Sequence, residues 1–158
     1  MNRASRLMGV FLAFTSLLAF GTRALATGGF GCEIDDANLK LSVSAGLGHG
    51  MGSPMLNFMG DAQLKAKDIP EDLRRFSLAP ALAHHWMADN ELRLHFYTEI
   101  TGDKPFASAE IVLKTSGGGE EEDYQGTYHL NIFTMFPPAD KEGGKTLAFE
   151  GKVICTVE

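Results

Sequence analysis

The sequence has few of the residues and motifs that mark a catalytic site. Its 158 residues include only two cysteines, one tryptophan and five histidines. It lacks the Gly-x-Ser-x-Gly elbow of many hydrolases, the His-Glu-x-x-His zinc motif and an EF-hand loop. No catalytic residue can therefore be assigned from motif spacing, and an uncharacterised hydrolase stays open only as a further alternative.

Long apolar runs are also absent, except near the N-terminus. A basic start carrying Arg3 and Arg6 precedes an apolar run over residues 7–20, and the small-x-small pattern Ala24-Leu25-Ala26 follows. This order is typical of a secretory signal peptide, and the run is too short for a stable transmembrane helix. We expect cleavage after Ala26.

The expected mature chain, residues 27–158, has the size of one ordinary domain. Removal of residues 1–26 takes away Arg3, Arg6 and Arg23 and lowers the formal net charge from −6 to −9. Such an acidic surface repels nucleic acid and anionic lipid, and no basic run offsets it, so both are excluded as partners. We expect a periplasmic or secreted protein without stable membrane insertion.

The two cysteines lie near the ends of this expected mature chain, at positions 32 and 155. In an exported protein, two cysteines in this arrangement indicate one disulfide. We therefore predict a bond between Cys32 and Cys155 that ties the two ends of the domain together. The bond would remove both thiols as nucleophiles or metal ligands.

Period-two alternation of apolar and polar residues is the dominant pattern and indicates half-buried β-strands. It marks six strands, over residues 39–45, 56–67, 92–97, 107–114, 127–132 and 147–157. A seventh strand is expected at 82–87, and one short helix at 70–76, where Pro70 precedes two acidic residues. The pattern predicts an all-β, antiparallel sandwich of six to seven strands with one short helix, or alternatively a small closed barrel.

The glycine-rich stretch GLGHGMGSPM, residues 46–55, lies between two predicted strands. A dinucleotide fingerprint would have to open a helix, and a P-loop would need Gly-Lys-Ser/Thr, so phosphate binding is excluded. Two interpretations remain: a connection between strands, or a site that uses His49 and Met51.

A copper site is the alternative function that this stretch suggests. His49 and Met51 form one His-x-Met element, and His85 and Met87 form a second. Imidazole and thioether groups suit Cu(I) in a compartment where thiols are oxidised. Paired His-x-Met elements are faintly similar to those of periplasmic copper chaperones, which are small β-sandwiches, although the distances between the elements differ. Copper is thus the alternative cofactor to none.

The orientation of the 82–87 strand bears on this alternative. We expect Trp86, as a lone tryptophan, to pack in the core, with His85 and Met87 pointing outward. A three-residue loop would then place His85 beside Arg93, which argues against a bound cation. A two-residue turn would reverse these orientations.

Aromatic residues on otherwise polar faces supply a candidate binding surface: Tyr97, Phe133 and Phe136. Exposed apolar groups with a polar rim can mark an interaction site. The competing interpretation is that the loop at 137–145 covers the two phenylalanines. By elimination, the sequence favours an exported, non-catalytic domain that binds an unknown protein or small ligand.

Overall fold

A computed structural model describes residues 28–48, 55–88, 90–117, 123–135 and 143–157. Most of this described chain is β-strand, and every strand pairing in it is antiparallel. The predicted all-β, antiparallel fold class is therefore confirmed. The expected signal peptide lies outside the described residues.

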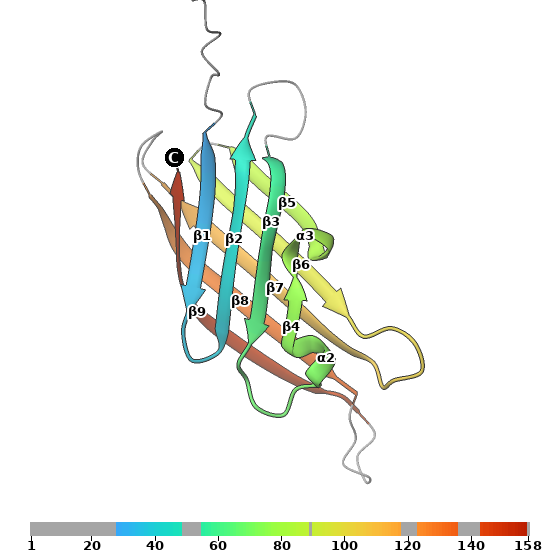
Figure 1. Cartoon of the computed structure of the whole chain (residues 1–158). Coiled ribbons are helices and arrows are strands. Elements are labelled where there is room, and N and C mark those ends of the chain that lie inside the picture. The colour runs from blue at the N-terminus through green and yellow to red at the C-terminus, as the bar shows by residue number, and fades with distance from the viewer. Residues whose placement is uncertain (1–27, 49–54, 89, 118–122, 136–142, 158) are drawn as a thin grey trace, which may run out of the picture.

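One nine-stranded sheet contains all the described strands, in the order β4-β3-β2-β1-β9-β8-β7-β6-β5. Its first half comprises β1 (Gly29–Asp35), β2 (Leu39–Leu47), β3 (Met55–Leu64) and β4 (Arg75–Ser77). Its second half comprises β5 (Leu82–Ala88), β6 (Glu91–Glu99), β7 (Ala107–Ser116), β8 (Tyr124–Thr134) and β9 (Lys145–Val157). The sheet curls into half a barrel, so that β1–β3 lie in front of the second half (Figure 1). It therefore shares the facing layers of a sandwich and the continuous sheet of a barrel.

The core lies between the two halves of the curled sheet. Leu41 and Val43 of β2 are buried, as are Leu94 and Phe96 of β6, whereas the residues between them point outward. The ring of Phe58 on β3 lies 6.1 Å from that of Phe96, which is a contact between the two halves. The period-two alternation thus separates one buried face of the sheet from one wet face.

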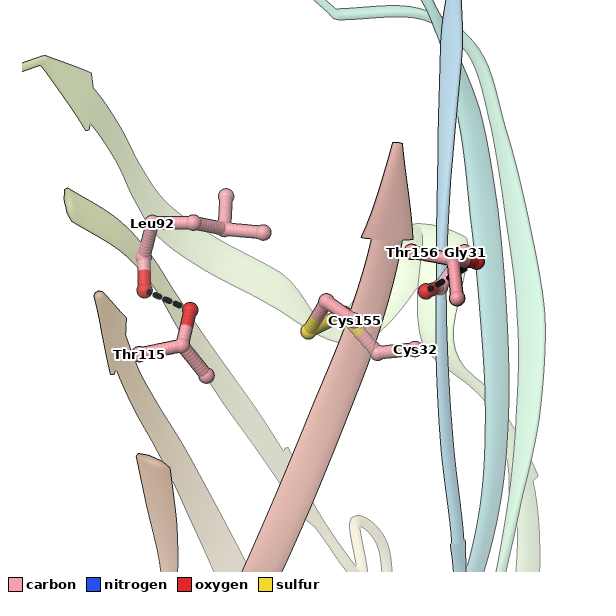
Figure 2. Close-up of a disulfide and its surroundings, with 6 residues drawn as sticks. All are labelled: Gly31, Cys32, Leu92, Thr115, Cys155 and Thr156. Atoms are coloured by element: carbon pink, nitrogen blue, oxygen red, sulfur yellow. Dashed lines mark hydrogen bonds between the residues drawn. A yellow bond between two sulfur atoms is a disulfide. The ribbon is translucent and has the colours of Figure 1, made fainter. Parts of the chain in front are cut away.

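Cys32 and Cys155 form a disulfide and are directly paired on β1 and β9. Figure 2 shows the bond between these two adjacent strands, with Thr156 Oγ1 donating a hydrogen bond to the carbonyl of Gly31 beside it. Both cysteines are fully buried. The predicted disulfide is confirmed, and it lies on the ladder that joins the two halves of the sheet.

At the other end of β1, the turn to β2 is fixed by Asp36. The backbone amides of Asn38 and Leu39 donate hydrogen bonds to Asp36 Oδ1 at 2.8 and 2.9 Å. Its second oxygen, Oδ2, accepts a 2.5 Å hydrogen bond from the hydroxyl of Tyr128 on β8. This hydrogen bond is a further side-chain contact between the two halves of the sheet.

The helical segment is shorter than the sequence predicts. Helix α2 (Glu71–Arg74) follows Pro70 as expected, but Arg75 adopts an extended conformation and starts β4, which pairs with β3. A second one-turn helix, α3 (Leu78–Ala81), packs against β3 and β6. Neither helix approaches the length and apolar character that crossing a membrane requires.

Candidate functional site

The outward face of the second half carries the most distinctive group of exposed side chains. A cavity of about 350 Å³ lies at its β5 edge. Its lining residues come from three strands and are His84, His85, Trp86, Arg93, Leu94, His95 and Val112. The cavity brings an indole, a guanidinium and several imidazoles together on an open sheet face.

Trp86 does not occupy the core, and the predicted orientation of its strand is wrong. Trp86 pairs with Arg93, and Ala88 pairs with Glu91, so the β5–β6 connection is a two-residue turn. Asn90 in this turn has a φ of 61°, which suits the tight turns of hairpins. The indole is 56% exposed on the outer face. The shorter turn places Trp86 on the outer face and Met87 on the core side, opposite to the expected orientations, whereas Leu82, beyond a register shift in β5, packs against the core as expected.

Two histidines stand beside the indole on the same face. His84 and His95 are cross-strand partners, and their rings are stacked with centroids 5.9 Å apart. His95 Nε2 lies 2.8 Å from Oε1 of Glu110 on the neighbouring strand. The amide of Asn131 donates a longer hydrogen bond, of 3.4 Å, to the other oxygen of Glu110. These contacts hold the ring of His95, which lines the cavity.

A row of side chains crosses all five strands of the second half next to these histidines. We call it the Trp86 row, and its members in strand order are Trp86, Arg93, Lys114, Thr127 and Lys152. The guanidinium of Arg93 lies 2.6 Å from a carboxylate oxygen of Glu91. Among the described residues, no carboxylate forms an ion pair with Lys114 or Lys152. Two of the three cations in the row are therefore not paired with a described carboxylate.

The structure describes only two of the four predicted copper ligands. His49 and Met51 lie outside the described residues. His85 is exposed, but Met87 is half-buried and packs against the core. Arg93 pairs with Trp86, not with His85, so the cation that was expected to oppose metal binding is not the cross-strand neighbour of His85. Within the described ranges no group of three or more His, Cys, Asp or Glu residues could hold a metal ion.

Two of the three residues of the predicted aromatic surface lie within the described chain. Tyr97 is 41% exposed and its hydroxyl donates a 2.7 Å hydrogen bond to Glu99, which raises the pKa of the tyrosine. Phe133 is half-buried, and its ring packs 5.9 Å from that of Phe106. Phe136 lies outside the described residues. Tyr97 alone among the three is an exposed aromatic side chain in the described chain.

A second cavity of about 350 Å³ lies on the outer face of the first half. Its lining includes Lys40, Asp61 and Arg75, side chains of both signs, and Phe76, whose ring packs against the core. This cavity lacks an exposed aromatic ring, so the cavity at Trp86 offers the richer set of contacts.

Comparison of the chain with models of protein families, with curated proteins and with solved structures finds no match. Any assignment of function to this fold therefore rests on the side chains that the curled sheet presents.

Proposed function

We propose that this protein is an exported, non-catalytic binding domain that holds a polar ligand on the outer face of β5–β9. The observation that carries the proposal is the exposed indole of Trp86, placed beside Arg93 and the stacked pair His84 and His95. An isolated tryptophan at the surface of a small acidic domain presents a large apolar face to solvent. A ligand that covers this face removes it from water and meets polar groups at its rim.

The chemistry around the indole suits binding better than catalysis. His95 Nε2 is engaged with Glu110, and both cysteines are bound to each other. Among the described residues, no serine, threonine or cysteine is hydrogen-bonded to His95, as a nucleophile activated by that base would be. The groups at the cavity can orient a ligand through hydrogen bonds and charge, which is what ligand sites require of their few polar side chains.

The fluorescence of the protein tests this proposal directly, because Trp86 is its only tryptophan. An extract of the compartment that receives the protein is separated into protein, lipid and glycan fractions, and each is added to the purified domain. We expect one fraction to shift the emission to shorter wavelength and to protect the indole from acrylamide quenching. Arg93→Gln should weaken this response, whereas Met59→Ala, on the outer face of the other half, should leave it unchanged. An emission that no fraction alters would contradict the proposal.

Copper(I) binding is the alternative function. The exposure of His85 favours it, since one imidazole of the two His-x-Met elements is accessible on edge strand β5. Met87 would have to leave its packing against the core in order to act as a ligand. Titration with Cu(I) against a competing chelator distinguishes this alternative from binding at Trp86.

A further inference from the structure

The Trp86 row has a linear geometry that a chain-like ligand could follow. Its five residues are successive cross-strand partners, one from each of β5 to β9. Neighbouring strands are spaced by about 4.8 Å, so the four steps of the row cover about 19 Å. The row therefore runs perpendicular to the strands and contacts a ligand through side chains, without offering it a free strand edge.

The charge of the row is opposite to that of the chain as a whole. Arg93, Lys114 and Lys152 are exposed within it, and it contains no acidic residue, whereas the whole chain has a formal net charge of −6. The acids beside the row are engaged: Glu91 with Arg93 at 2.6 Å, and Glu150, two residues before Lys152 on β9, with His129 at 3.8 Å. A polyanion repelled by the rest of the surface would find its favourable contacts concentrated here.

The single aromatic ring in this row indicates what kind of polyanion fits. The centres of protein–protein interfaces gather several apolar and aromatic side chains. Trp86 instead has the polar side chains of His84, Arg93 and His95 around it. The only aliphatic side chains that line the cavity are those of Leu94 and Val112. Leu94 is fully buried and Val112 only half-exposed. A sugar ring matches these surroundings, because it has one C–H-rich face that can stack on an indole and a rim of hydroxyl groups.

We propose that the Trp86 row binds an acidic polysaccharide. Trp86 stacks on one sugar ring, and Arg93, Lys114 and Lys152 pair with carboxylates along the polymer. Thr127 lies between the two lysines and supplies a hydroxyl for hydrogen bonding. This inference rests on the proposed binding function and names the ligand class for the same surface.

Calorimetric titration at low ionic strength tests the ligand class with four probes: alginate, neutral dextran, poly-L-glutamate and a thymidine oligonucleotide. Alginate has both carboxylates and sugar rings, dextran lacks the charge, and poly-L-glutamate lacks the rings. We expect alginate to bind at least tenfold more tightly than any of the other three, with an affinity that falls as salt is added. Equal or tighter binding of poly-L-glutamate or of the oligonucleotide overturns the proposal, as does the absence of alginate binding.

Substitutions then locate the site. Trp86→Ala should weaken alginate binding about tenfold while changing poly-L-glutamate binding little, because only the sugar stacks on the ring. Lys114→Gln combined with Lys152→Gln should weaken alginate binding and flatten its salt dependence. Lys67→Gln removes one exposed charge outside the row, and Met59→Ala removes an exposed apolar side chain from the other half; neither should have an effect. Loss of affinity in these controls equal to that in the row variants would overturn the proposal.

The outcomes also separate this inference from the proposed function. If alginate fails to bind but another ligand class shifts the fluorescence of Trp86, the polysaccharide proposal is wrong and the binding function stands. If the fluorescence of Trp86 responds to no ligand of any class, both are wrong.

Discussion

The hydroxyl of Tyr128 donates a hydrogen bond to Asp36 Oδ2 at 2.5 Å, although the two residues are 92 positions apart in the sequence. Tyr128 is fully buried on β8, and Asp36 lies in the turn between β1 and β2. Burial, followed by this hydrogen bond, raises the pKa of Tyr128. The contact holds the β1–β2 turn against the opposite half of the sheet.

Removal of this hydroxyl tests the contribution of the contact to stability. We expect Tyr128→Phe to lower the free energy of unfolding by about 1.5–3 kcal/mol, because a hydrogen bond to a charged group is lost while the ring stays packed. Urea denaturation measures the change. Tyr97→Phe is the matched control: its hydroxyl bonds to Glu99 on the surface, and its loss should cost less than about 0.5 kcal/mol. Equal losses in the two variants would contradict this interpretation.

The same contact predicts how stability depends on pH. Burial raises the pKa of Asp36, but the hydrogen bonds from Tyr128, Asn38 and Leu39 outweigh it, so the net shift is downward. A carboxylate with a lowered folded-state pKa stabilises the fold above its unfolded value, near 3.8, and that contribution is lost as the pH falls through the folded value. We expect Asp36→Asn to flatten the loss of stability in acid. Denaturation midpoints measured between pH 6 and pH 2 check this; an unchanged slope would count against it.

The disulfide should make a larger contribution. It links residues 123 positions apart, and the chain-entropy model gives a loss of about 4–5 kcal/mol when such a loop is opened. We expect the double variant Cys32→Ala/Cys155→Ala to melt well below the wild type, with the difference removed when the wild type is measured in reductant. Mass spectrometry of the unreduced protein should show the two cysteine peptides joined. Two alkylatable thiols in protein from its native compartment would refute the bond.

Gly126 on β8 should not tolerate a side chain. A Cβ there would lie 2.7 Å from the Cα of Thr115 on β7 and would overlap the carbonyl oxygen of Lys114. We expect Gly126→Ala to destabilise the fold by about 1–3 kcal/mol, as overpacking does. Gly31→Ala is the control, because its Cβ would meet ordinary contacts of 3.7 and 3.8 Å. Thermal melting of both variants gives the comparison, and a neutral Gly126→Ala would show that β7 and β8 shift enough to accept a methyl group.

Copper binding is decided by titrating the protein with Cu(I) against a competing chelator. We expect no competition above the buffer background. We also expect His49→Ala/Met51→Ala to change the free energy of unfolding by less than about 0.5 kcal/mol, as surface substitutions usually do. Competition by the wild type that this double variant abolishes would support the copper alternative, as would a copper-dependent gain in melting temperature.

The sequence predicts the strands whose alternation is regular, and it fails where local chemistry obscures the pattern. In β1, Phe30, Cys32 and Ile34 alternate on the buried face, but glycines at 29 and 31 occupy outward positions and weaken the strand signal. β4 has only three residues and forms because it pairs with the edge of β3. Neither strand could be recognised from its own residues alone.

The sequence does not predict the candidate site, for a different reason. The hydrophobic character of Trp86 favoured the core, whereas Asp89-Asn90 in a two-residue turn would have favoured the opposite orientation. The turn residues predict the orientation of the strand better than Trp86 does. Turn length sets the pairing register of a hairpin, whereas the burial of one side chain does not set it. The Trp86 row could not be predicted at all, since it depends on the alignment of five strands.

The position of β9 has a consequence for how the chain can be made. Among the described strands β9 comes last in the sequence, yet it lies in the middle of the sheet, between β1 and β8. Until it arrives, the first strand has no partner on that side, and contacts so distant in sequence form slowly. A product truncated before residue 145 would expose the edges of both β1 and β8, and unpaired strand edges are the usual starting point of aggregation. Premature termination of translation would therefore yield two partial sheets with aggregation-prone edges and not a smaller version of the domain.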